Sequence, residues 1–310
     1  MLNYLLESNA DIIGLQEVSS LNLLLGKKDW FDTLNGANGL TAAGYTCVKG
    51  LDTYTGSEHS SSLINEREKT MFNPIYFKTD KYTLIANDTI WFTDAEHRYE
   101  ASRIDGANTD KALNYVVLED KETGVRFMYV NLHLIVKGDY KDDAKTEKNN
   151  NWIKDANGNL TDHQVQELQV VYLREILEDL QEQYDLPMFI GGDFNNSAST
   201  ITSWYNKSIV NDGIVSSNGN PTVAVKVTAA SKNAENVVIT DPSTSTIEND
   251  KFETRKDYTG GPIDLWFVAN FEGAMHCYIL DDNKNETTGK YPSDHLPTVF
   301  IVTLYSEKTN

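Results

Sequence analysis

Short apolar runs, separated by polar or glycine-containing breaks, recur along this 310-residue chain. Short runs rich in β-branched and aromatic side chains and bounded by turn residues are typical of strands. The pattern therefore predicts strands at residues 11–18, 45–48, 72–77, 82–85, 89–92, 112–119, 125–134, 186–190, 262–268, 274–280 and 297–304.

One long segment, residues 163–184, has helical rather than strand spacing. Its apolar positions recur every three or four residues, as on the buried stripe of an amphipathic helix. We expect this helix to lead into the strand at 186–190, with shorter helices at 2–9 and 201–205. The residues of the apolar stripe are Val165, Leu168, Tyr172, Leu173, Ile176, Leu177 and Leu180.

The composition allows one large domain. With 40% hydrophobic residues the chain can bury a sizeable core, and no internal repeat or Pro-rich or Gly/Ser-rich linker divides it. We therefore expect a single domain over residues 1–310. No segment approaches the length of a membrane span, and residues 1–8 lack the basic start and apolar core of a signal peptide. We expect a soluble protein, while its compartment and oligomeric state stay open.

Cysteine content and charge exclude some classes of site. Only Cys47 and Cys277 are present, which excludes a Cys-rich zinc site and leaves at most one bridge; we expect two free thiols. The formal charge of −19 argues against a broad basic surface for nucleic-acid backbones. It is compatible with phosphate chemistry at a site that recruits a divalent cation, because the cation reverses the local field.

The most informative stretch is Gly191-Gly192-Asp193-Phe194-Asn195, which follows the apolar run at 186–190. A strand here delivers Asp193 and Asn195 to its carboxyl end, two residues apart and so on one side of the extended chain. The glycines let the backbone approach a ligand closely. An Asp-Asn turn that only closes the strand is the structural alternative.

Other polar groups lie at predicted strand ends. Glu17 ends the first strand and is a candidate ligand for a hard cation, although an isolated acid there also suits a helix start. His133 ends another strand, where a lone histidine often has only a structural role. Asp264 opens an otherwise apolar strand and needs a partner, and the pair Asp294-His295 precedes the last strand.

In this order the motifs resemble the endonuclease/exonuclease/phosphatase superfamily of metal-dependent phosphoesterases, over about Leu5 to Leu304. The resemblance implies the α/β class: a four-layer sandwich of two mixed β-sheets packed face to face and flanked by helices. The motifs that carry it are Gln16-Glu17, Asn131-Leu132-His133, Gly192-Asp193-Phe194-Asn195, Ile263-Asp264 and Ser293-Asp294-His295.

The resemblance also implies roles for residues. Glu17 would bind Mg²⁺ or Mn²⁺, with Asp294 in the same acidic cluster. Asp193 would orient or deprotonate the attacking water, and Asn195 would hold that water and a phosphoryl oxygen.

Two histidines complete the implied site. His295 would contact the scissile phosphate with its ring fixed by Asp264, and His133 would stabilise charge from the other side. In-line attack at phosphorus requires charge neutralisation, a positioned water and donors aimed at the equatorial oxygens, which this set supplies.

The chain departs from the family in two places. The family begins with a strand that carries an Asn near the metal, and this chain begins in the following helix, so we expect it to be N-terminally incomplete. Many relatives also have a Glu before the strand that begins near Asn73, where this chain has Met71; Glu66 or Glu68 could substitute.

The substrate stays open. The Trp ahead of Gly-Asp that marks inositol 5-phosphatases is missing, and so is the Lys after Gln-Glu-Thr of the exonuclease III group; Tyr291 to Pro297 looks more like a bacterial branch. The first hypothesis is a Mg²⁺-dependent phosphodiesterase or phosphatase acting on a small or lipid-linked phosphate. The alternatives are an endo- or exonuclease and a catalytically dead binding module.

Overall fold

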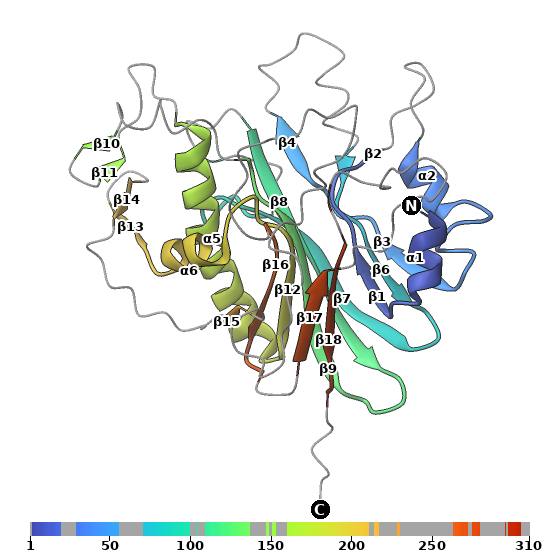
Figure 1. Ribbon diagram of the computed structural model, residues 1–310. Helices are drawn as coiled ribbons and strands as arrows, with labels where there is room; N and C mark the ends of the chain where they lie inside the picture. The colour runs from blue at the N-terminus through green and yellow to red at the C-terminus, as the bar shows by residue number, and fades with distance from the viewer. Residues whose placement is uncertain are drawn as a thin grey trace, which may run out of the picture.

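A computed structural model gives the fold (Figure 1). It describes residues 2–19, 29–55, 71–99, 104, 109–136, 147–148, 151–152, 160–210, 214–216, 228–229, 263–271, 275–279, 295 and 297–304. No helix in these ranges is long and apolar enough to span a membrane.

The larger sheet has seven strands and supplies most of the site. β8 and β9 form a hairpin, β9 and β12 run parallel, and β16 is antiparallel to β12, so the sheet is mixed. Its strands in spatial order are β15 (Thr228–Ala229), β16 (Asp264–Ala269), β12 (Met188–Asp193), β9 (Arg126–His133), β8 (Thr109–Asp120) and β4 (Thr53–Thr55), with β7 (Tyr82–Trp91) also paired to β8.

The second strand layer is made of short antiparallel pieces. It packs on the larger sheet through Phe127, Tyr129, Phe189 and Val268. In the described part of the chain, β1 pairs only with β6, and β18 pairs only with β17. The pieces are β1 (Ile12–Gly14) with β6 (Ile75–Lys78) and β3 (Tyr45–Val48), β17 (Met275–Ile279) with β18 (Thr298–Val302), and β2 (Val18–Ser19) with β5 (Met71–Phe72).

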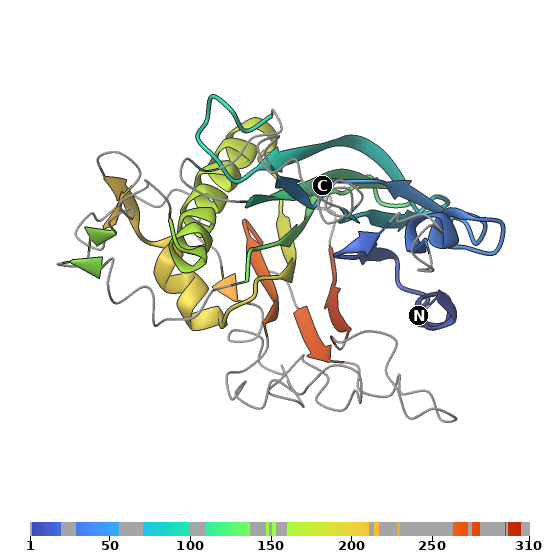
Figure 2. The same cartoon turned by 90° about the horizontal axis from the view of Figure 1, so that it is seen from above.

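Helices lie outside both strand layers, as Figure 2 shows. α5 (Asp162–Tyr184) and α6 (Ala198–Tyr205) cover the larger sheet, and α1 (Leu2–Ser8) and α2 (Trp30–Asn35) lie beside the second layer. This arrangement confirms the predicted four-layer α/β sandwich. Two hairpins, β10 (Glu147–Lys148) with β11 (Asn151–Trp152) and β13 (Ser208–Val210) with β14 (Ile214–Ser216), lie near α5 and α6 (Figure 1).

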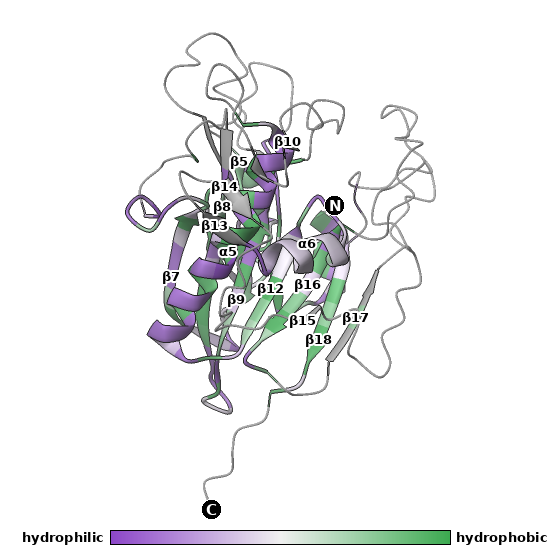
Figure 3. Cartoon of the chain, turned by 90° about the vertical axis from the view of Figure 1, so that its left-hand side faces the viewer, coloured by the Kyte–Doolittle hydropathy of each residue, from purple (hydrophilic) through white to green (hydrophobic). Residues whose placement is uncertain are grey.

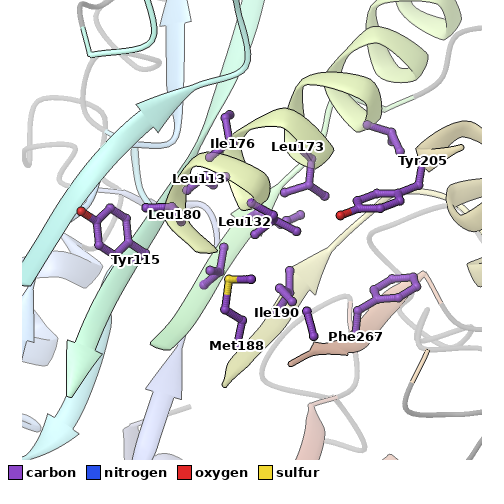
Figure 4. Packing of buried hydrophobic residues seen from close by; sticks show 14 of the residues in the cluster. Leu113, Tyr115, Leu132, Leu173, Ile176, Leu180, Met188, Ile190, Tyr205 and Phe267 are labelled. Carbon is purple, nitrogen blue, oxygen red and sulfur yellow. The ribbon is translucent and has the colours of Figure 1, made fainter. Parts of the chain in front are cut away.

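α5 packs on the sheet through a continuous apolar core (Figure 4). Leu173, Ile176 and Leu180 of the helix meet Leu132 of β9 and Met188 of β12 in one cluster. The strands β12, β16 and β18 are largely hydrophobic, whereas α5 carries many hydrophilic positions (Figure 3).

Those hydrophilic positions correct the prediction of a simple amphipathic helix. Four polar residues in the N-terminal half of α5 are buried, so this half is covered on its polar side as well: Gln164, Gln166, Glu167 and Gln169.

The two strands predicted at 82–85 and 89–92 form one strand, β7, with a register shift between Leu84 and Ala86. Cys47 and Cys277 are both free thiols, as expected.

Candidate functional site

Three of the predicted residues meet at one edge of the larger sheet. Asp193, the last residue of β12, lies opposite His133 of β9 and opposite Asp264 of β16. Neighbouring residues in register project from the same face of a sheet, so all three side chains converge. Gly192 permits this crowding, because at its φ of +142° a β-carbon would lie 2.0 Å from the Leu132 carbonyl oxygen.

Asp193 is the central carboxylate. Its Oδ1 accepts the backbone N–H of Asn195 at 2.8 Å, and its Oδ2 lies 3.8 Å from His133 Nε2 and 3.9 Å from His295 Nε2. Burial and the charge of nearby Asp264 raise the pKa of Asp193 to about 6, against the opposing effect of the two histidines. A carboxylate with this pKa is ionised at neutral pH and is still a useful base.

Each histidine is backed by an acid. His295 Nδ1 lies 2.8 Å from Asp264 Oδ2, and His133 Nδ1 lies 3.0 Å from an oxygen of Asp52. A carboxylate can only accept, so each ring donates from Nδ1 and turns Nε2 toward Asp193. The expected pairing of His295 with Asp264 is therefore present, and a second pair mirrors it across Asp193.

Asp52 was missed in the sequence and is fully buried. Besides His133, it accepts from Lys111 Nζ at 2.9 Å and from Asn73 Nδ2 at 2.8 Å. Burial alone would raise its pKa, but the charges of His133 and Lys111 outweigh burial and lower it well below the usual range.

The acid behind His133 therefore comes from the segment that enters β4. Glu66 and Glu68, which could substitute for the family's Glu before the strand near Asn73, lie outside the described residues. Nothing in the local pattern Gly50-Leu51-Asp52-Thr53 marks an active-site acid, and Asp52 is buried although the adjacent Leu51 is exposed.

Glu17 reaches the same site from the second strand layer. Its backbone has a φ of +54°, and its N–H donates to Asn73 Oδ1 at 3.2 Å. The side chain is 59% exposed, with Oε1 4.0 Å from His133 Nε2. The preceding Gln16 donates to Asn131 Oδ1 at 2.6 Å, which ties the end of β1 to β9.

Asn195 forms hydrogen bonds that hold the loop beside the site. It has a φ of +51°, and its Nδ2 donates to the Leu134 carbonyl oxygen at 2.9 Å. The side-chain amide is thus already engaged beside the site. The other predicted metal ligand, Asp294, lies outside the described residues.

The donor set suits a hard divalent cation. Asp193, Asp264 and His295 each place one potential ligand atom within 4.8 Å of the others, and the exposed Glu17 carboxylate adds an oxygen nearby. Oxygen-rich sites with few protein carboxylates are those that Mg²⁺ and Mn²⁺ favour. Burial first and then the charge of Asp264 raise the pKa of Asp193, and a bound cation would offset both effects.

Comparison by sequence finds no matching protein-family model and no matching curated protein. Comparison of structures finds clear likenesses. A mannosyl-6-phosphatase from Bacteroides thetaiotaomicron superposes with a TM-score of 0.62 at 16% identity, over 97% of this chain and 88% of that chain. An endonuclease/exonuclease/phosphatase from Bacteroides vulgatus gives 0.61 at 17% identity, over 98% and 88%.

This chain has the endonuclease/exonuclease/phosphatase fold. TDP2 from D. rerio, solved with a single-strand DNA product, shares the fold with a TM-score of 0.53 at 14% identity, over 97% of this chain and 88% of that one. In this fold the ends of β9, β12 and β16 bring His133, Asp193 and Asp264 together, and β1 leads to Glu17.

Proposed function

We propose that this protein is a divalent-cation-dependent hydrolase of phosphoester bonds. One observation carries the proposal: a buried carboxylate, Asp193, lies between two imidazoles that are each oriented by an acid. A fold alone does not assign chemistry, so the proposal rests on this arrangement.

In the proposed reaction Asp193 takes a proton from a water molecule as its oxygen attacks phosphorus. The bond to the leaving oxygen then breaks, that oxygen takes a proton from solvent water, and Asp193 returns its proton to solvent. When each ring carries a second proton, the Nε2 atoms of His133 and His295, which lie on either side of Asp193, donate to phosphoryl oxygens as negative charge builds on them. Positioned acid–base groups of this kind contribute roughly a hundred- to ten-thousandfold in rate.

Glu17 and Asp294 would hold Mg²⁺ or Mn²⁺ beside this set. When bound, the cation would neutralise negative charge on the phosphoryl oxygens. Asp264 and Asp52 fix the two rings, and Asn195 fixes the Asp193 carboxylate through its backbone N–H.

A small or lipid-linked phosphate is the substrate class that we favour. The formal charge of −19 opposes the counterion release that drives binding to polynucleotides. The alternative is a nuclease, which finds support in the likeness to TDP2 bound to a DNA product. A dead binding module has little support, because both acid–histidine pairs are intact.

A substrate panel tests the proposal. We expect hydrolysis of bis-p-nitrophenyl phosphate or p-nitrophenyl phosphate with Mg²⁺, loss of activity in EDTA, and loss in Asp193→Asn. Plasmid DNA and sphingomyelin, run in parallel, separate the nuclease from the lipid phosphodiesterase. Cleavage of plasmid DNA alone would replace the favoured substrate class with the alternative.

A further inference from the structure

One fully buried side chain on α5 contacts both loops that carry the site. Gln166 Nε2 donates to the carbonyl oxygens of Ile135, Phe194 and Asn195 at 2.6, 3.2 and 3.4 Å. Its Oε1 accepts from Asn196 Nδ2 at 3.0 Å. The side-chain amide of Gln166 therefore makes hydrogen bonds to four groups, and the residue is 0% exposed.

These partners come from two different strand ends. Ile135 follows His133 at the end of β9, and Phe194 to Asn196 follow Asp193 at the end of β12. Two further bonds join the same loops: Leu134 N–H donates to the Asp193 carbonyl oxygen, and Asn195 Nδ2 donates to the Leu134 carbonyl oxygen, both at 2.9 Å. Gln166 lies where the two loops meet.

The loop backbone needs this support. Asn195 has a φ of +51°, a conformation that costs energy for a side-chain-bearing residue and persists only where its surroundings hold it. Carbonyl groups buried away from water also require donors. Removing the amide would leave the carbonyl groups of Ile135 and Phe194 without this donor, and the loop could then relax away from its present position.

We propose that Gln166 is a positioning residue for the reaction, which holds Asp193 and Asn195 in place relative to His133. The inference rests on the proposed phosphoester hydrolysis. A displacement of about 1 Å in a catalytic group can cost a hundredfold in rate. Because the side-chain hydrogen bonds of Gln166 within the described part of the chain go to loop carbonyl groups and to Asn196, its loss alters the geometry of the attacking water without removing a group that binds substrate.

Two variants of Gln166 and one control define the test. Gln166→Met keeps the shape of the side chain and removes every hydrogen bond. Gln166→Glu keeps the shape and, in its protonated form, one donor. Gln183→Met makes the same change at an exposed position of the same helix.

With bis-p-nitrophenyl phosphate and Mg²⁺, we expect Gln166→Met to lower kcat by tenfold to a hundredfold, with KM within about twofold of wild type. Gln166→Glu should lose less, and Gln183→Met should match wild type. If Gln166→Met does not fold, the Glu variant carries the comparison. A kcat within twofold of wild type in folded Gln166→Met, or an equal loss in Gln183→Met, overturns the proposal.

Hydrogen exchange separates this proposal from the proposed function. The N–H groups of Leu134 and Asn195 bond to Asp193. In a folded Gln166 variant they should exchange at least tenfold faster than in wild type, while amides in the β8–β9 hairpin keep their protection. If wild type hydrolyses no phosphoester, the proposed function fails, and this experiment still decides: unchanged protection at Leu134 and Asn195 overturns the positioning role.

Discussion

Asp193→Asn should stabilise the metal-free protein while it abolishes turnover. Burial and the charge of Asp264 raise the pKa of Asp193 from 3.8 to about 6, which means that the folded protein holds the ionised form at a cost. Asparagine has nearly the same shape, carries no charge, and keeps an oxygen that accepts the backbone N–H of Asn195.

The sign of the pH dependence follows from the raised pKa. The folded state binds the proton more tightly than the unfolded state, so between about pH 4 and pH 6 wild-type stability falls as pH rises. A shift of this size corresponds to about 3 kcal/mol above pH 6. For a chain of 310 residues this is roughly 4–5 °C in Tm.

Thermal unfolding in EDTA at pH 4 to 8 measures the effect. We expect Asp193→Asn and wild type to melt together near pH 4, and the variant to melt higher above pH 6. The exposed carboxylate of Asp80 supplies the control, since Asp80→Asn should follow wild type at every pH. Equal or lower melting of Asp193→Asn at pH 8 would refute the electrostatic reasoning.

Other variants probe the two acid–histidine pairs and the pH dependence of the rate. Asp52→Ala should destabilise the fold by about 3–5 kcal/mol in urea unfolding, because it leaves the half-buried Lys111 beside His133 without its carboxylate; unchanged stability contradicts the account of this network. Asp264→Asn should lower kcat at least tenfold with little change in Tm, since it removes the charge that orients His295; a wild-type kcat would show that this orientation is unimportant. The rate in saturating Mg²⁺ should fall at acid pH, where Asp193 takes up a proton, with a midpoint below about 6 because a bound cation lowers the pKa of the carboxylate; a rate that stays constant down to the lowest pH at which the protein is folded would remove Asp193 as the base.

Much of the site could be predicted because strands have a regular geometry. Asp193, His133 and Asp264 each follow or open an apolar run, and adjacent strands place such residues at one edge. His295 and its contact with Asp264 came from the family pattern. The four layers were predicted in the same way.

The rest depends on contacts between distant segments, which a single sequence does not reveal. Asp52 is a lone acid before a three-residue strand, and only the packing of β4 on β8 brings it to His133. From the sequence, the polar face of α5 is predicted to be exposed to solvent, whereas the structure buries part of it. Gln166 has helical spacing like its neighbours, and its role arises from the loops that surround it.

Hydrolysis of bis-p-nitrophenyl phosphate by wild type and His295→Ala, each with Mg²⁺ and with EDTA, tests the central claim most directly. The account predicts turnover only for wild type with Mg²⁺, and a His295→Ala protein that keeps its Tm because the ring is partly exposed at the site. Full activity of wild type in EDTA, or of the folded His295→Ala variant with Mg²⁺, would contradict the account.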